Sequence, residues 1–142
     1  MDKHSSKVFE YHITVSPNDI DALNHVNNIV YLRWVQEAAI AHWAQLSNEA
    51  INKKYIWVVM RHEIDYLQPA LCGDALIAHT WVGKNEGAKS KRHTQLYNSV
   101  SKKKLAEAVT TWCLLEAISK RPKRIEEDIL SLFTPCPFKG ET

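Results

Sequence analysis

Hydrophobic and polar positions divide this chain into one alternating segment, one long apolar segment and four more alternating segments. Residues 8–15 alternate aromatic or β-branched side chains with polar ones, a period of two that predicts a strand. Residues 27–46 contain four alanines and neither glycine nor proline, which predicts a helix about 30 Å long at 1.5 Å per residue.

The apolar residues of the predicted helix are spread around most of its circumference, whereas a surface helix would confine them to one stripe. We therefore expect the helix to be largely wrapped by the rest of the chain. The apolar positions are Ile29, Val30, Leu32, Trp34, Val35, Ile40, Trp43 and Leu46.

Four long strands are predicted after the helix, at about 56–68, 74–85, 89–100 and 105–118. Turn residues separate them, among them Pro69, Gly73 and Gly87, so we expect antiparallel neighbours. Acidic residues open the segment 125–133, which predicts a short C-terminal helix. The order is strand, helix and four strands, an α+β fold.

Composition limits the class of protein. A chain of 142 residues with 45% hydrophobic content fits one domain, and we expect a single domain over residues 1–142. The net charge of +2, from 18 basic and 16 acidic residues, is too balanced for a general nucleic-acid binder. No apolar run approaches the roughly 18 residues needed to span a bilayer, and the start has no signal-like segment, so a cytoplasmic location without membrane insertion is expected.

Neither the spacing of the cysteines nor the position of His62 favours a metal site. Cys72, Cys113 and Cys136 are odd in number and lack C-x-x-C spacing, so plain thiols are expected rather than disulfides or a zinc site. His62 lies on a predicted strand beside Glu63, an arrangement typical of a surface network. No metal site is predicted.

The densest polar segment of the chain precedes the long helix. Residues 19–31 contain two carboxylates, one histidine and three asparagines. Such side chains favour helix N-caps, and the first N–H groups of a helix carry partial positive charge. A carboxylate beside such a terminus predicts a base and an oxyanion site together.

Written as D-x-D-x-x-x-H-V-N-N-x-x-Y, this segment resembles the signature of hotdog-fold acyl-CoA thioesterases of the 4-hydroxybenzoyl-CoA thioesterase type. The resemblance extends from the first strand to the turn at Arg121 and Pro122. It implies the hotdog fold, in which a curved antiparallel sheet wraps a long helix. It also implies hydrolysis of an acyl-CoA to a carboxylic acid and coenzyme A, without a metal or redox cofactor.

Asp21 is the predicted catalytic carboxylate. By itself it would be an ordinary helix-capping or turn residue. Because it occupies the second D of D-x-D, the resemblance implies a general base or a nucleophile, and the sequence leaves both routes open. Asp19 is expected to be a turn or salt-bridge residue.

Asn28 is the predicted oxyanion position. A backbone N–H at a helix N-terminus can stabilise the charge on an attacked thioester carbonyl, by about 2.7–4 kcal/mol per donor. Counting back three positions from Tyr31, which matches the family's tyrosine, the resemblance places this amide at Asn28. Asn27 and Tyr31 are predicted substrate-binding residues, although Asn27 and Asn28 could equally act as caps.

His25 could bond the carbonyl, relay a proton or brace the loop, and bracing is favoured. The segment also resembles acyl-carrier-protein thioesterases, in which a histidine acts with an asparagine two residues earlier. Here Leu23 holds that earlier position, while Pro69 and Ala70 replace an acidic residue and a cysteine. Asp21 is left as the one convincing acid-base group.

Basic residues flank the turn at Gly87. Such clusters are usually solvated, but coenzyme A carries several phosphates and arginine binds phosphate bidentately. In the resembled family the nucleotide lies on the surface near these strands, which makes Ser90 and Arg92 predicted coenzyme A contacts. Trp34 or Trp57 is expected to border an acyl tunnel.

Long strands leave sheet edges that proteins usually pair or cover. We therefore expect a homodimer or tetramer, and the resemblance implies active sites between two subunits. Two other functions stay open. One is hydrolysis of acyl-carrier-protein thioesters, and the other is a noncatalytic module that binds acyl thioesters.

Overall fold

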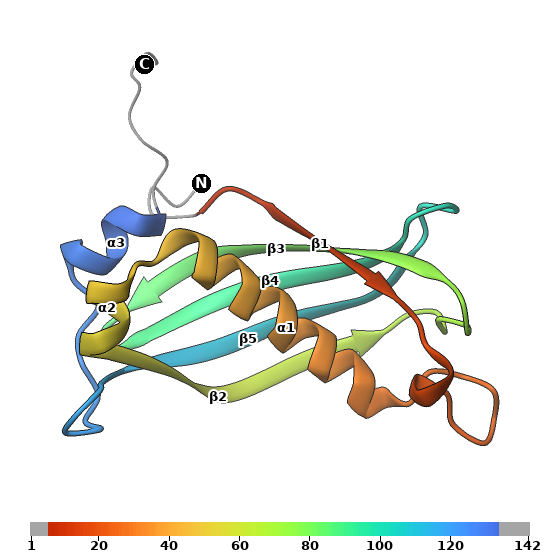
Figure 1. Ribbon diagram of the computed structural model, residues 1–142, viewed down its shortest axis with the longest axis horizontal. Coiled ribbons are helices and arrows are strands. Elements are labelled where there is room, and N and C mark those ends of the chain that lie inside the picture. Colours follow the sequence, from red (N-terminus) through yellow and green to blue (C-terminus); the bar gives the residue numbers. More distant parts are fainter. Residues whose placement is uncertain (1–5, 134–142) are drawn as a thin grey trace, which may run out of the picture.

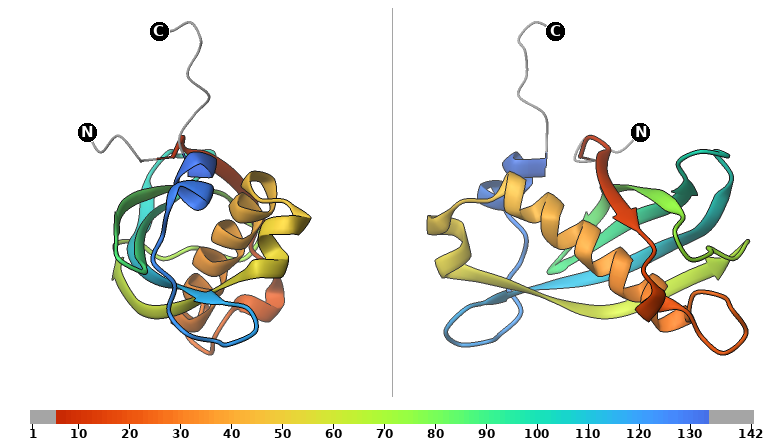
Figure 2. Two further views of the ribbon diagram at one scale, coloured as in Figure 1. Left: turned by 90° about the vertical axis from the view of Figure 1, so that its left-hand side faces the viewer. Right: turned by 45° about the vertical axis from the view of Figure 1, so that its right-hand side comes forward.

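A computed structural model describes residues 6–133 and confirms the α+β hotdog fold (Figure 1). Figure 2 shows the sheet curved around the long helix α1. The strands are β1 (Phe9–Thr14), β2 (Tyr55–Tyr66), β3 (Ala75–Glu86), β4 (Lys89–Asn98) and β5 (Lys104–Glu116). The helices are η1 (Pro17–Asp19), α1 (Asn28–Leu46), α2 (Glu49–Lys54) and α3 (Glu127–Phe133). The two short helices η1 and α2 were not predicted.

The sheet has the order β1-β3-β4-β5-β2, with every pair antiparallel. The expectation that consecutive strands are neighbours is correct for β3, β4 and β5 but wrong for β2, which pairs with β5. The loop after β2 does not form a tight hairpin to β3, because its backbone carbonyls accept hydrogen bonds from residues that lie before α1 in the chain. Val26 donates to the carbonyl of Ala70, and Val15 donates to that of Asp74. The loop therefore crosses from one edge of the sheet toward β1.

Helix α1 buries one stripe of side chains rather than its whole circumference. The buried positions recur every three or four residues and are Val30, Tyr31, Trp34, Val35, Ala38, Ala39 and His42. Ile29 and Ile40 are 72% and 62% exposed, so the expectation that the helix is largely wrapped is wrong for this chain. The physical reason is that the sheet covers only one side of α1 (Figure 2).

Strand β2 forms a long sheet edge. It spans 12 residues and bonds only to β5, and its ladder shifts register between Val59 and Arg61. Met60, at this irregularity, is an exposed apolar residue. An unpaired edge of this length is a template for another strand. Within residues 6–133 no helix is long and apolar enough to cross a membrane.

We predict that the chain self-associates through the β2 edge. Sedimentation at micromolar concentration should give a multiple of the 16.3 kDa chain mass. Met60→Lys should weaken the association, because lysine on an edge strand opposes strand pairing. Val100→Lys is the matched control, since Val100 is an exposed apolar residue in the turn between β4 and β5. A stable monomer of the unaltered chain would contradict the prediction.

Candidate functional site

Residues 21–25 form a small loop that closes on itself just before α1. An isolated bridge joins Ile20 to Val26, and the Asp21 N–H donates to the carbonyl of His25 at 2.7 Å. Asn24 has φ +68°, in the left-handed region that asparagine tolerates better than most residues. This local pairing fixes the shape of the loop without help from the sheet.

Asp21 is exposed on this loop and uses one carboxylate oxygen to hold it. Its Oδ1 accepts the N–H of Leu23 at 2.9 Å and that of His25 at 3.2 Å. Its Oδ2 has no hydrogen bond within residues 6–133. The carboxylate is thus oriented through one oxygen, while the other is available to a water molecule or a substrate.

His25 braces the loop through its backbone, whose N–H and C=O both bond to Asp21. Its imidazole is exposed and makes no hydrogen bond within the described part of the chain. The two alternative roles, bonding the carbonyl and relaying a proton, are untested, and no described side chain orients the ring.

The start of α1 leaves one backbone donor unused. The Asn27 side chain caps the helix by accepting from Ile29 N–H at 3.1 Å, and the Asn27 carbonyl accepts from Val30 N–H. The N–H of Asn28, the first helical residue, has no partner among residues 6–133. An unpaired N–H at a helix N-terminus carries partial positive charge. Asn27 therefore acts as a cap, and the Asn28 amide is a ready anion-binding donor.

Asp19 has the structural role expected of it. Its buried carboxylate lies 3.0 Å from Arg33 Nη2, and its second oxygen accepts both the N–H and the hydroxyl of Ser16. Burial acts to raise the pKa of Asp19, but the hydrogen bonds from Ser16 and Arg33 outweigh it and hold the pKa below its usual 3.8. Asp19 thus ties the approach to α1 to the helix itself.

Tyr31 lies in the core rather than on a substrate path of this chain. It is 3% exposed, and its hydroxyl accepts the Ala70 N–H at 2.9 Å. Its ring makes edge contacts with Trp34 and Tyr66, and burial raises its pKa. Tyr31 therefore anchors the loop after β2 to α1, and its role in substrate binding stays a prediction.

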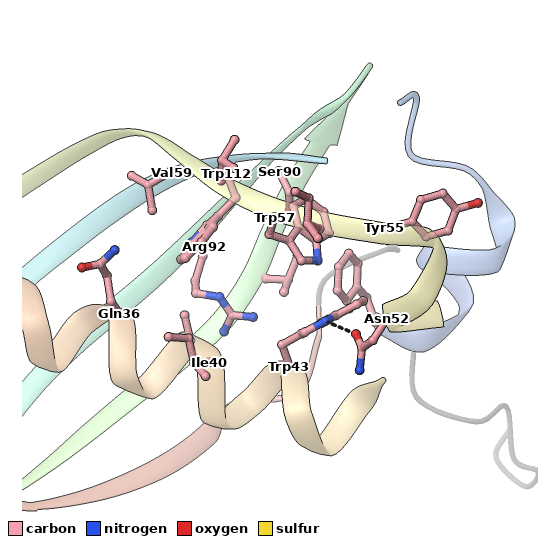
Figure 3. A pocket seen from close by; sticks show the side chains of 15 residues that line it. Gln36, Ile40, Trp43, Asn52, Tyr55, Trp57, Val59, Ser90, Arg92 and Trp112 are labelled. Carbon is pink, nitrogen blue, oxygen red and sulfur yellow. Dashed lines mark hydrogen bonds between the residues drawn. The ribbon is translucent and has the colours of Figure 1, made fainter. Parts of the chain in front are cut away.

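A cavity of about 560 Å³ lies between the C-terminal half of α1, β2 and the inner face of the sheet (Figure 3). Trp57 borders it as expected, whereas Trp34 is a core residue. Its walls are mainly apolar and aromatic, as in many ligand sites. The apolar lining includes Ile40, Trp43, Trp57, Val59, Val82 and Phe133.

Ser90 and Arg92 line this cavity instead of lying on the outer surface. Both are buried, and Arg92 is 5% exposed. Their prediction as surface contacts for coenzyme A phosphates is wrong in position, because strand alternation places them on the same face as the buried Leu96. Lys89 and Lys91 occupy the opposite, exposed face of β4.

Arg92 is held by two neighbours. Its Nη1 lies 2.9 Å from His42 Nδ1 and 3.1 Å from Thr80 Oγ1. The ring of Phe9 stacks on His42 at 4.9 Å. Burial lowers the pKa of Arg92 to about 10 and, with the nearby guanidinium, lowers that of His42 to about 4. Arg92 is therefore a cation beside a neutral imidazole at neutral pH.

The predicted site residues fall into two groups within one chain. Asp21, His25, Asn27 and Asn28 gather at the N-terminus of α1, while Ser90 and Arg92 lie beside its C-terminal half. The first cavity residue on α1 is eight positions after Asn28, about 12 Å along a helix. One chain thus does not bring the acidic loop and the cavity into a single pocket.

The structure is a hotdog fold, a long helix held in a curved antiparallel sheet, and near the helix start it has a carboxylate with one unbonded oxygen and a backbone amide without a partner among residues 6–133. The chain belongs to the Thioesterase-like superfamily, whose family model matches residues 15–133.

One curated protein and two solved structures are similar to this chain. A chloroplastic palmitoyl-acyl carrier protein thioesterase from Gossypium hirsutum is 23% identical over 137 residues, covering 90% of this chain and 33% of that protein. The chain therefore spans about a third of this curated relative. A 1,4-dihydroxy-2-naphthoyl-CoA thioesterase from Synechocystis superposes with TM-score 0.78 at 18% identity, covering 89% of this chain and 96% of that one. A 12:0-ACP thioesterase from Umbellularia californica gives 0.77 at 15% identity, covering 91% and 51%.

We predict that Asp19→Asn destabilises the protein by about 1.5–3 kcal/mol at neutral pH, the range for hydrogen bonds to a charged group. Since the pKa of Asp19 is lowered on folding, its contribution is present above the unfolded pKa and is lost as pH falls through the folded value. Urea unfolding should therefore show a gap between wild type and variant that closes below about pH 4. Asp65→Asn, on the exposed face of β2, is the control and should change little. A gap that does not depend on pH would contradict the prediction.

Proposed function

We propose that the protein is an acyl-CoA thioesterase of the 4-hydroxybenzoyl-CoA thioesterase type. The single observation that carries the proposal is that two groups in the segment leading into α1 are both left without a hydrogen bond to any described residue. These are the Oδ2 atom of Asp21 and the N–H of Asn28. A base and an oxyanion donor are the two groups that thioester hydrolysis needs.

In the proposed reaction, Asp21 Oδ2 takes a proton from a water molecule while the oxygen of that water attacks the thioester carbonyl. The carbonyl becomes an oxyanion that accepts the Asn28 N–H. Collapse of this intermediate breaks the carbon–sulfur bond, and the proton held by Asp21 passes to the departing thiolate. The products are a carboxylic acid and coenzyme A. In the alternative route, Asp21 attacks the carbonyl directly and forms an anhydride. A single turnover in isotopically labelled water would put labelled oxygen into Asp21 only by this alternative route.

The acyl group is proposed to lie in the cavity of the partner subunit. The acidic loop and the cavity are separated within one chain, and pairing through the β2 edge would bring a second copy of both to the interface. Each active site would then combine the loop of one subunit with the cavity of the other.

Coenzyme A is proposed as the carrier for two reasons. The chain spans nearly the whole of the naphthoyl-CoA enzyme but only about half of the 12:0-ACP enzyme. Lys89 and Lys91 are also exposed on the outer face of β4, where phosphates can reach them. A hydrolysis panel that compares acyl-CoA with the matching acyl carrier protein thioester tests this choice. Binding of both without turnover of either would instead indicate a noncatalytic module.

We predict that Asp21→Asn lowers kcat by about 10²–10⁴-fold, the contribution of one positioned proton acceptor. Asparagine keeps an oxygen to accept the Leu23 and His25 amides, so the loop and the oligomer should persist. Asp74→Asn is the control, because Asp74 likewise accepts a nearby backbone N–H, that of Leu71, from within a loop. Steady-state hydrolysis of one acyl-CoA is the measurement. Equal losses in the two variants would return Asp21 to a purely structural role.

We predict that Asn28→Pro lowers kcat by about 10²–10³-fold, the cost of removing one oxyanion donor. Proline is well tolerated at the first position of a helix, and the preceding Asn27 already has the extended backbone (φ −62°, ψ 136°) that proline requires. The substitution therefore deletes the N–H with little change to the helix.

Asn28→Ala is the matched variant, since it removes the side chain and keeps the amide. It should retain most of the activity. A larger loss in Asn28→Ala than in Asn28→Pro would show that the side chain acts, rather than the backbone. Far-ultraviolet circular dichroism of both variants checks that the helix is intact.

A further inference from the structure

Arg92 is a buried cation with no acidic partner among residues 6–133. No carboxylate oxygen of these residues lies within 4.0 Å of its guanidinium, and its two protein contacts, His42 and Thr80, are uncharged groups at neutral pH. Removing an ion from water costs several kcal/mol unless an opposite charge or hydrogen bonds compensate. The guanidinium therefore lacks the counter-ion that its position requires.

The unused donors of Arg92 belong to the cavity side of the group. Both protein contacts use Nη1, which leaves Nε and Nη2 without a hydrogen bond within the described chain. Neither atom is sealed from the cavity. Figure 3 shows the Arg92 side chain crossing from β4 toward α1, near Gln36 and Ile40. The free edge carries three N–H donors, a number and geometry suited to a bidentate carboxylate.

Two further polar groups lie beside this edge. Ser90 faces Trp112 across the β4–β5 ladder, and both line the cavity. The Nε1 of Trp112 is buried without a hydrogen-bond partner, and the Ser90 hydroxyl has none within residues 6–133. By the same measure that leaves the Arg92 edge open, the Trp112 Nε1 is sealed from the cavity, so of these two groups the Ser90 hydroxyl is the one open to a ligand oxygen. Among the described lining residues Arg92 is the one charged group in an otherwise neutral wall.

We propose that the cavity binds an acyl group that ends in a carboxylate, held by Arg92 with the hydroxyl of Ser90. This inference rests on the proposed thioesterase function and names the substrate class as ω-carboxyacyl thioesters. The apolar walls contact the methylene chain, and the terminal carboxylate supplies the charge that Arg92 lacks. The thioester end points out of the cavity toward the acidic loop of the partner subunit.

The test compares suberoyl-CoA with octanoyl-CoA, which differ only in the terminal carboxylate. The wild-type protein should favour suberoyl-CoA in kcat/KM by about tenfold or more. Arg92→Met should lower this ratio by about 10–100-fold, mainly through KM, the range of a lost charged hydrogen bond. Arg92→Lys should lie between the two, because lysine keeps the charge but not the bidentate geometry.

Lys103→Met is the control, since it removes the same charge from an exposed position in the turn between β4 and β5 and should leave the ratio unchanged. Ser90→Ala deletes one hydroxyl from the cavity wall and should reduce the ratio about tenfold. This variant provides an independent test if Arg92→Met does not fold, which thermal unfolding would reveal. An equal preference for the two thioesters in the wild-type protein would overturn the inference.

A binding assay separates this inference from the proposed function. Three tryptophans, Trp43, Trp57 and Trp112, line the cavity, so ligand entry should change the fluorescence. Monomethyl suberate should bind more tightly than methyl octanoate, and Arg92→Met should abolish the difference. If Arg92→Met abolishes this binding difference while the wild-type protein hydrolyses neither thioester, the cavity assignment stands and the thioesterase proposal fails. Hydrolysis without preference, together with tight binding of free octanoate, would show that Arg92 holds a product carboxylate and would refute the ω-carboxyacyl assignment.

Discussion

The packing of α1 on one side of a curved sheet determines where each functional group lies. Small side chains at Ala38 and Ala39 let the middle of the helix approach the strands, and the hydroxyl of Tyr31 fixes its beginning through Ala70. The helix start, with its free amide, is thereby held near the acidic loop. Its other end stands beside β2, where large aromatic side chains border a cavity rather than fill it.

Much of the fold was predictable because each strand carries its own alternating pattern and each turn after β2 its own glycine, proline or run of polar residues. Residues 75–116 illustrate this, since β3, β4 and β5 are joined by short turns that leave little choice of partner. The pairing of β2 with β5 was not predictable, because it depends on hydrogen bonds between the loop after β2 and distant residues such as Val15. The helix pattern also misled. Ile29 and Ile40 are apolar positions that a single chain leaves exposed, so hydrophobicity alone did not indicate burial.

The candidate site was only partly predictable. The capping role of Asn27 and the salt bridge of Asp19 follow from local chemistry, and the structure contains both. The burial of Arg92 was not predicted, because its charge suggested an exposed position while its place in the alternating pattern of β4 indicated a buried one. Arg92 lies four residues before the buried Leu96, so strand alternation places both on the inner face of the sheet. Lys91 lies on the outer face. The neighbours that hold it, His42 and Thr80, come from other elements, and no short motif connects them.

The self-closed loop at residues 21–25 also affects how freely this protein can change during evolution. Its shape depends on backbone bonds between Asp21 and His25 and on the Ile20–Val26 bridge, so the exposed side chains of Ala22 and Leu23 contribute little to stability. Leu23 is 77% exposed and supplies only its N–H. Such positions can drift with little thermodynamic penalty. Substitutions there would alter the surface presented to a carrier or a partner subunit while the carboxylate stays in place, which separates the evolution of recognition from that of chemistry.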